Sequence, residues 1–453
     1  MVEATTDGMG QFSAGPPPGS RSAAKPKLTP SGGSAVHAVT SVGALSHLRV
    51  LDLSRVLAGP WCTQILADLG ADVVKVERPG EGDDTRHWGP PFLLDAQGKD
   101  STQASYFTCT NRNKRSITLD IAKQQGQALV RQMAERSDVL VENFKVGGLA
   151  HYGLDYASLK ALNPRLIYCS ITGFGQSGPY AERAGYDLMI QAMSGMMSIT
   201  GRPDETPGGG PLRVGVALTD LFTGVYASTA ILAALEVRNR TGVGQHIDMA
   251  LLDVGMATLA NQASGFLNTG KAPQRQGNSH PSLAPYQDFP TQDGAMLLAI
   301  GNDGQFKRFC QAVGKPEWSA DARFTGNTSR VKNRTVLIPL MEQVTRERST
   351  AQWIALLQDK AVPCGPINDI ARAFDDAQVK ARGLAVSQPR SPELVAQDGI
   401  SAIRGVASPL RLVDTPPTLR HAPPALGQHT DEVLAELGLD PAGIAALRAA
   451  GVV

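Results

Sequence analysis

Asp220 is the residue whose surroundings most directly suggest chemistry. It is the lone acid inside an otherwise uncharged run that extends over residues 214–235. An ionised carboxylate in apolar surroundings is costly unless it is hydrogen-bonded or paired, and its pKa otherwise rises. We therefore expect this carboxylate to be hydrogen-bonded, paired with a cation or chemically employed, for example as a nucleophile.

Helix capping is the simplest alternative role for such an acid. Asp187 precedes the helix-like run 188–193, and its spacing favours an N-cap, which contributes about 1 kcal/mol. Asp220 also precedes an apolar run, so the residues alone leave capping and catalysis equally open. The two roles are compatible, because a helix N-terminus helps to keep a carboxylate ionised, as a carboxylate nucleophile requires.

Basic residues gather near the predicted carboxyl ends of strands. They are Lys75, Arg78, Arg86, Arg112, Lys114 and Arg115. For any single one of them, a solvated loop charge is the simpler interpretation. Collectively they could hold phosphates, which an α/β sheet binds at the same strand ends.

A glycine-rich segment at 173–178 has the spacing of a dinucleotide-binding loop and follows a predicted strand. Pro179 and Tyr180 stand where the helix of that fingerprint should continue. No acid follows at the distance, about 20 residues, at which a ribose is held. The segment therefore indicates a glycine-rich loop near a ligand rather than an NAD site.

Alternating strands and helices place these candidates. The pattern predicts strands at 48–53, 71–77, 116–120, 139–143 and 166–171, and helices at 58–69, 125–136 and 156–162. Such βαβ units predict an α/β fold with a doubly wound parallel sheet, whose ligands lie at the carboxyl ends of the strands. Arg78, Asn143 and Thr172 lie at such ends.

Composition divides the chain into four parts. Residues 1–45 are rich in Gly, Pro, Ser and Ala and are expected to be a disordered tail. An organellar transit peptide is the alternative there, although Glu3 and Asp7 weigh against it. A large Rossmann-like domain is predicted for 46–240, a small domain with linkers for 241–380, and a C-terminal segment for 381–453. The small domain is expected to contain a strand at 295–300 and helices near 305–313 and 351–359. The C-terminal segment is expected to contain helices near 431–437 and 441–450.

Bulk properties exclude several classes of protein. The net charge is +1, from 43 basic and 42 acidic residues without a block of like charges, so neither a nucleic-acid nor a membrane-surface partner is expected. No apolar stretch reaches the roughly 18 residues of a membrane helix. The cysteines are odd in number and far apart, and the histidines are scattered, which predicts no disulfide framework, no metal site and a reducing cytoplasm. The cysteines are Cys62, Cys109, Cys169, Cys310 and Cys364.

Eight short segments, taken in order, carry a family resemblance. They include LDLSRVLAGP at 51–60, LGADVVKVERP at 69–79, NRNKRS at 111–116, VENF at 141–144, TD at 219–220, TGVGQ at 241–245, VPCGP at 362–366 and LGQHTD at 426–431. In their order and joint spacing the chain resembles the class III CoA-transferases, also called the CaiB/BaiF family. That family includes formyl-CoA:oxalate and carnitine CoA-transferases and, as a relative, α-methylacyl-CoA racemase.

The resemblance implies a role for each candidate residue. Asp220 matches the family nucleophile, whose carboxylate forms an acyl-aspartyl anhydride and then an aspartyl-CoA thioester. No permanently bound cofactor is implied, since coenzyme A and acyl-CoA are substrates. His151 stands where some relatives have arginine. The implied CoA-binding residues are Leu57, Ala58, Arg78, Leu119, Asp120, Ile121, Ala122, Asn143, Phe144, Lys145, His151, Ala184, Gly185, Tyr186 and Asp187.

The implied architecture is an interlocked homodimer of ring-like chains. Each chain would have a large Rossmann-like domain, to which both terminal parts belong, and a smaller α+β domain. A glycine-containing loop and backbone N–H donors are expected over the active site. Succinyl-CoA is the first candidate donor and a small dicarboxylate the first candidate acceptor. Oxalate is disfavoured, because Leu57 replaces a glutamine of the formyl-CoA enzymes and the segment 277–286 replaces their run of glycines.

Two alternatives remain open beside the transferase. The racemases use a histidine immediately before the position of Asp187, and Tyr186, with an ordinary pKa of about 10, suits a base at neutral pH poorly. A non-catalytic CoA-binding subunit would not need Asp220. The sequence therefore favours acyl exchange over both.

Overall fold

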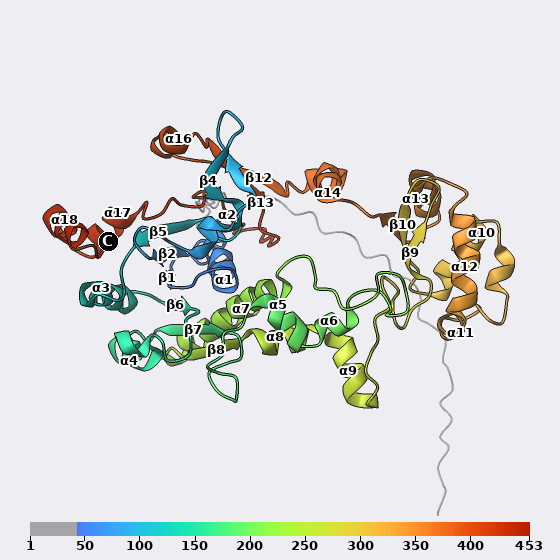
Figure 1. Ribbon diagram of the computed structural model, residues 1–453, viewed down its shortest axis with the longest axis horizontal. Helices are drawn as coiled ribbons and strands as arrows, with labels where there is room; N and C mark the ends of the chain where they lie inside the picture. Colours follow the sequence, from blue (N-terminus) through green and yellow to red (C-terminus); the bar gives the residue numbers. More distant parts are fainter. Residues whose placement is uncertain (1–42) are drawn as a thin grey trace, which may run out of the picture. The chain divides into compact units, whose positions relative to one another are not determined.

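A six-stranded parallel sheet is the largest element of the structure, a computed structural model that describes residues 43–453 (Figure 1). All its strands pair in parallel, in the order β5-β2-β1-β6-β7-β8. Numbered within this sheet alone the order is 3-2-1-4-5-6, which reverses between β1 and β6 and creates a ligand-binding crevice there. The predicted α/β fold is confirmed. The strands are β1 (Arg49–Asp52), β2 (Asp72–Glu77), β5 (Lys114–Thr118), β6 (Val139–Glu142), β7 (Ile167–Thr172) and β8 (His246–Ala250).

Alternating side chains of these strands build two separate cores. In β1, Val50 packs into one hydrophobic cluster and Leu51 into the other, and in β6 Val139 and Leu140 divide in the same way. A strand points successive side chains to opposite faces, so a sheet covered on both faces needs continuous apolar strands. This requirement explains why the sequence reads Val-Leu at both places.

Helices cover both faces of the sheet. One face packs against α1 (Ala58–Asp68), α5 (Asp187–Met193), α7 (Leu218–Thr241) and α8 (Leu251–Thr258). The other face packs against α3 (Gln124–Glu135), α4 (Tyr156–Leu162), α17 (Thr430–Glu436) and α18 (Pro441–Ala449). The C-terminal helices therefore share a core with the N-terminal strands, as the family resemblance implied for the last part of the chain.

Two features differ from the sequence prediction. The strand β8 pairs with β7, so the large sheet extends beyond residue 240, where the small domain was expected to begin. Between β2 and β5 the chain also forms elements that were not predicted: η1 (Asp84–His87), β3 (Phe92–Leu94), β4 (Asp100–Ala104) and α2 (Ser105–Thr108). The tail predicted for residues 1–45 falls outside the described residues up to residue 42.

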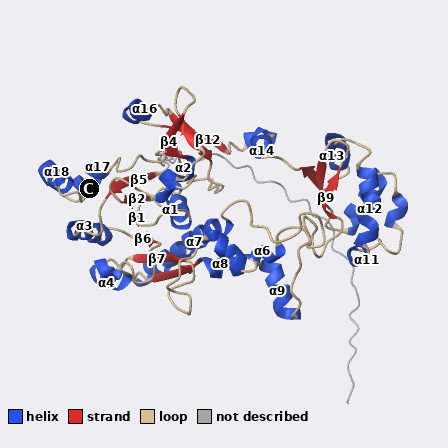
Figure 2. Ribbon diagram, in the orientation of Figure 1, coloured by secondary structure: helices blue, strands red, loops and turns tan. Residues whose placement is uncertain are grey.

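A second group of elements has its own core and a three-stranded antiparallel sheet in the order β11-β10-β9 (Figure 2). Phe289, Phe306 and Trp353 are among its buried side chains. The group consists of β9 (Tyr286–Pro290), β10 (Ala295–Ala299), α10 (Asp303–Ala312), η3 (Pro316–Ser319), α11 (Asn327–Lys332), α12 (Arg334–Thr345), α13 (Thr350–Asp359) and β11 (Cys364–Pro366).

Short elements complete the described chain. The strands β12 and β13 pair as an antiparallel hairpin. These elements are η2 (Ala150–Tyr152), α6 (Met196–Ile199), α9 (Ala260–Thr269), α14 (Ile370–Asp375), α15 (Ala377–Ala381), β12 (Ala385–Pro389), α16 (Pro392–Asp398) and β13 (Ala402–Val406).

The helix α7 carries Asp220 and packs closely against α1. A Cβ atom on Gly224 would lie 2.7 Å from the carbonyl oxygen of Ala58, so only glycine permits this approach. By length and a mean hydropathy of 1.4, α7 is the one described helix that could cross a membrane. It nevertheless contributes Ala227, Ile231 and Leu235 to the core beside the sheet, as the central helix of a globular protein does.

Candidate active site

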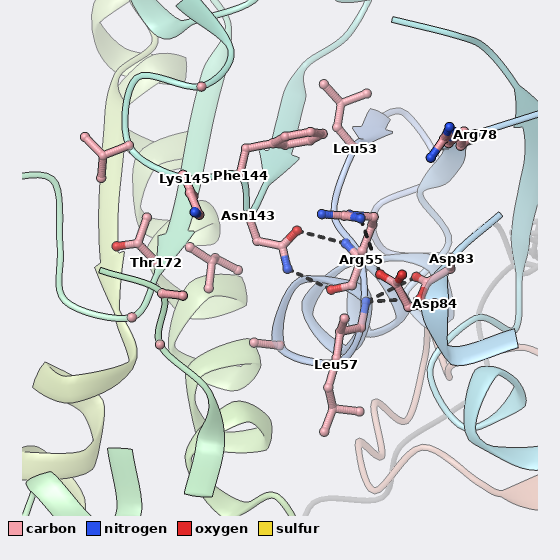
Figure 3. Close-up of a pocket in the computed structure, with 18 of the residues that line it drawn as sticks. Leu53, Arg55, Leu57, Arg78, Asp83, Asp84, Asn143, Phe144, Lys145 and Thr172 are labelled. Carbon is pink, nitrogen blue, oxygen red and sulfur yellow. Dashed lines mark hydrogen bonds and ion pairs between the residues drawn. The ribbon is translucent and has the colours of Figure 1, made fainter. Parts of the chain in front are cut away.

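A cavity of about 800 Å³ lies at the carboxyl ends of the sheet strands (Figure 3). Residues that follow β1, β2, β5, β6 and β7 line it, and Asp220 reaches it from α7. The cavity thus includes the point between β1 and β6 where the strand order reverses. This is the place at which open parallel sheets bind their ligands.

The cavity brings together nearly all of the residues that the family resemblance implies for catalysis and CoA binding. Two of these residues are not among those that line it: His151, which is exposed, and Asp187, which is hydrogen-bonded to Thr219, the neighbour of Asp220. Tyr152 lines the wall beside His151. Those that line it are Leu57, Ala58, Arg78, Leu119, Asp120, Ile121, Ala122, Asn143, Phe144, Lys145, Ala184, Gly185, Tyr186 and Asp220. Their role in CoA binding stays a prediction.

Asp220 is the third residue of α7, in its first turn, rather than the N-cap, which is Ala217. Its side chain is half-buried, and among the residues that the structure describes no donor hydrogen-bonds its carboxylate. Burial, and next the charge of Asp187, raise the pKa of Asp220 to about 7. Burial therefore opposes the expected effect of the helix terminus, which was to help keep this carboxylate ionised.

Asp187 caps a helix, but not the one that the sequence suggested. It is the first residue of α5, whose N-cap is Tyr186. Its carboxylate accepts hydrogen bonds from the backbone N–H and the hydroxyl of Thr219, at 2.9 and 2.6 Å, and from Nε2 of Gln191 at 2.7 Å. Thr219 is the second residue of α7, so Asp187 caps the helix that carries Asp220. The sequence could not show this, since the two segments lie 32 residues apart.

A reciprocal pair of hydrogen bonds bridges the segments that follow β1 and β6. Asn143 accepts from the backbone N–H of Arg55 at 2.9 Å and donates to its carbonyl oxygen at 2.7 Å (Figure 3). Arg55 also forms an ion pair with Asp84 at 3.3 Å. Sequence reasoning missed Arg55, although its position after β1 is equivalent to that of Arg78 after β2.

Most of the basic residues that were candidates for phosphate binding are occupied elsewhere. Lys75, Arg86, Arg112, Lys114 and Arg115 form ion pairs with Asp83, Glu77, Asp68, Asp52 and Asp72, respectively, and none of the five lines the cavity. The structure contradicts the phosphate-binding prediction for these five. Local sequence does not reveal pairing partners that lie on other strands and helices.

Among residues 43–453, four other cations line the cavity: Arg55, Arg78, Lys145 and Arg183. The ion pair between Arg78 and Glu81 is solvent-exposed. Arg183, which sequence reasoning also missed, lies with its guanidinium carbon 4.5 Å from the ring centre of Tyr180. This stacking orients the guanidinium and leaves its N–H groups available for an anion.

The glycine-rich segment after β7 forms part of the wall. A Cβ atom on Gly173 would lie 2.5 Å from the Cα atom of Gly185, so two backbone segments touch at the cavity. Close backbone packing accounts for both glycines without a nucleotide fingerprint. None of the lining residues comes from the segment 277–286, for which a place over the site was expected. Within the described residues no cluster of His, Cys, Asp and Glu could hold a metal ion.

Comparisons with known proteins point to one family. The model of CoA-transferase family III matches residues 45–430. A succinate–glutarate CoA-transferase of Agrobacterium fabrum is 51% identical, over 87% of this chain and 95% of that protein. A succinyl-CoA:glutarate CoA-transferase of Mus musculus is 42% identical, over 91% of both chains. The crystal structure of a CaiB/BaiF family protein from Brucella suis, 50% identical, superposes with a TM-score of 0.76 over 87% of this chain and 99% of that one.

Proposed function

The chain belongs to CoA-transferase family III and is a CoA-transferase, and from this premise we propose that it carries CoA from succinyl-CoA to a small dicarboxylic acid, with glutarate as the first candidate. The proposal rests on the state of the Asp220 carboxylate. This carboxylate lines the cavity, and among the described residues neither a hydrogen-bond donor nor a cation contacts it. A carboxylate left in this state is free to act as a nucleophile.

Four substitutions at carbonyl carbons make up the proposed reaction. The Asp220 carboxylate attacks the thioester of the donor, which forms a mixed anhydride and releases CoA thiolate. The thiolate attacks the aspartyl carbonyl, which forms an aspartyl-CoA thioester and releases the donor acid. The acceptor carboxylate then attacks this thioester, which forms a second mixed anhydride and again releases CoA thiolate. The thiolate attacks the acceptor acyl carbonyl, which forms the acceptor CoA thioester and releases the Asp220 carboxylate. Every intermediate keeps the Asp220 carboxyl group in an activated form, as an anhydride or a thioester, and no net proton is consumed.

The four cations that line the cavity suit the phosphates of CoA. Arg78 and Lys145 are the two that the family resemblance implies, and Arg55 and Arg183 lie on the same walls. Guanidinium groups bind phosphate oxygens through paired hydrogen bonds. The acyl end of the substrate would then extend toward Asp220, so that the carboxylate and the thioester meet inside the cavity.

We further propose a homodimer located in the cytoplasm. Large apolar side chains are exposed in the segments that carry Asp187 and Asp220, among them Tyr186, Leu188, Val216 and Phe222. Exposed apolar patches of this kind mark interaction surfaces, and a second copy would also exclude the water that hydrolyses an anhydride. The cytoplasmic location is supported by the five cysteines, all of which are free.

The acceptor is tested with succinyl-CoA and a panel of acids: glutarate, malate, oxalate, carnitine and valerate. We expect kcat/KM to be highest for glutarate and at least about tenfold lower for oxalate, which lacks three methylenes. Valerate is the matched control, because it has the same chain length and no second carboxylate. Appearance of the acceptor CoA thioester is followed by liquid chromatography. Failure with every dicarboxylate would overturn the substrate proposal.

The proposed nucleophile also predicts a pH dependence. Asp220 must be ionised to attack, and its raised pKa means that this form accumulates only as the pH rises through about 7. Below that value kcat/KM should fall by about tenfold per pH unit. Asp187→Asn removes one cause of the raised pKa and should move the acid limb to lower pH, whereas a profile unchanged by this substitution would contradict the coupling.

Tyr186 favours transfer over racemisation at this site. It lines the cavity at the position where racemases of the family have their histidine, and it is largely exposed. A racemase would exchange the α-proton of an acyl-CoA with solvent. Incubation with 2-methylacyl-CoA in D₂O should therefore leave the α-proton in place, as proton NMR would report.

A further inference from the structure

The loop that joins β1 to α1 contains an unusual backbone conformation. Val56 has a φ angle of 70°, in the left-handed region. A β-branched residue is a rare occupant of this region, because its side chain crowds the backbone there. Such a conformation persists only when the surroundings impose it, and it occurs preferentially at functional sites.

Asp83 is the group that imposes this conformation. Both of its carboxylate oxygens lie 3.2 Å from the backbone nitrogen of Val56. Figure 3 shows Asp83 near Arg55 and Leu57, the residues on either side of Val56, and both of these line the cavity. On the other flank of Val56, the reciprocal hydrogen bonds between Arg55 and Asn143 hold the chain.

The carboxylate of Asp83 is itself firmly held. Lys75 donates to it at 2.9 Å, and both side chains are fully buried. The backbone N–H and hydroxyl of Thr85 add hydrogen bonds at 3.0 and 2.8 Å. Burial alone would raise the pKa of Asp83, but Lys75 and Thr85 bring it down to about 2, so the group stays ionised throughout the physiological range.

The conformation of Val56 affects the position of the two residues that follow it, Leu57 and Ala58. Leu57 is the N-cap of α1, with φ −132° and ψ −61°, and its side chain cannot satisfy the free N–H groups of the first turn. Leu57 and Ala58 line the cavity. A change of sign in φ at Val56 would turn this stretch of main chain, and the start of α1, away from its present position.

We propose that Asp83 is a positioning residue for CoA binding: by holding Val56 in the left-handed conformation, it aims the main chain of Leu57 and Ala58 into the cavity. This inference rests on the proposed function, in which CoA occupies the cavity. Lys75 has an indirect role, because its ion pair with Asp83 keeps the Asp83 carboxylate ionised and in place. Asp83 is among the residues that line the cavity, but its side chain is almost completely buried, so its effect on the substrate is exerted through the main chain of Val56.

Two matched pairs of variants test this role, with binding of CoA itself measured by isothermal titration calorimetry. Asp83→Asn should raise the Kd by about tenfold, the effect of losing roughly one charge-assisted hydrogen bond. Asp84→Asn removes the same charge from the same wall but leaves Val56 alone, and its effect should be clearly smaller. Equal effects of the two substitutions would overturn the positioning role.

The second pair acts on Val56 and leaves the buried ion pair intact, so it guards against a failure of Asp83→Asn to fold. Val56→Pro fixes a negative φ and removes the N–H, and it should weaken CoA binding about as much as Asp83→Asn, by about tenfold. Val56→Gly tolerates φ 70° and should weaken binding less. In the Asp83→Asn background, Val56→Gly should restore part of the lost affinity. Equal effects of proline and glycine would contradict the inference.

Failure of the inference and failure of the proposed function give different results. A wild-type protein that binds no CoA would overturn the proposed function. CoA binding that is equally tight in the Asp83 and Asp84 variants would overturn the positioning role alone. Thermal unfolding without CoA gives an independent check, since the shifts in Tm for Asp83→Asn and Val56→Gly should not add if the two residues are coupled.

Discussion

Asp220→Ala is expected to lower kcat for CoA transfer by at least about a thousandfold, because no other group can form the covalent intermediate. Asp253→Asn is the matched control. Asp253 is also the third residue of its helix, α8, but it is exposed and does not line the cavity. Activity within twofold of wild type for Asp220→Ala would end the assignment of the nucleophile, as would the absence of a hydroxylamine-trapped species in the wild-type enzyme incubated with acyl-CoA.

The same residue predicts a trade-off between activity and stability. The folded-state pKa of Asp220, about 7, lies above the ordinary value of an aspartate, 3.8. Between these two values the folded protein binds more protons than the unfolded chain, so this group makes the fold less stable as the pH rises. Asp220→Asn should therefore raise Tm at pH 8 relative to wild type while it removes activity, and the difference should shrink below about pH 4. A loss of activity accompanied by a loss of Tm would instead indicate misfolding.

Lys114→Met is expected to lower the free energy of unfolding by about 3–5 kcal/mol, because it leaves a buried carboxylate without its cation. Lys114 and Asp52 form an ion pair at 3.0 Å, and both side chains are fully buried. Lys114 also donates to the carbonyl oxygen of Pro60 and to Oδ1 of Asn111, each at 2.9 Å. Urea unfolding followed by circular dichroism measures the change.

Two controls separate the buried charge from a general effect of substitution. Asp52→Asn combined with Lys114→Met removes both charges and should recover part of the lost stability. Arg240→Ala breaks the exposed pair with Glu236 and should change the free energy of unfolding by less than about 1 kcal/mol. A Lys114→Met protein as stable as the Arg240→Ala protein would show that the buried pair contributes little.

The lysines of two buried ion pairs also hold the main chain at the start of α1. Lys114 reaches Pro60 in the first turn of α1, and Lys75 reaches the carbonyl oxygen of Ser54 just before the loop. Burial lowers the pKa of Lys114 to about 8, which Asp52 opposes without overcoming it. Two lysines that were candidates for phosphate binding thus serve to hold the main chain from which the cavity wall is made.

Much of the sheet could be predicted from the sequence, because its signal is local. The run of apolar residues in β1, β6 and β7 reports burial on both faces, and the predicted bounds of α4 match the structure. The strand β8 was missed, since His246-Ile-Asp-Met-Ala250 is short and mixed in polarity, as suits an edge strand. The hairpin of β3 and β4 was missed because β3 has only three residues and β4 is largely polar.

By itself the sequence determined the α/β order, the strand ends at which a ligand would bind, the family resemblance and the singular position of Asp220. The order of the elements and the strand ends follow from periodicity, the position of Asp220 follows from its place along the chain, and the resemblance follows from eight short segments in order. Only the tertiary structure decided that Asp187 caps the helix of Asp220, that the pKa of Asp220 is raised, and that Asp83 holds Val56. Each of these depends on groups brought together from distant segments, and on burial that neither segment produces alone.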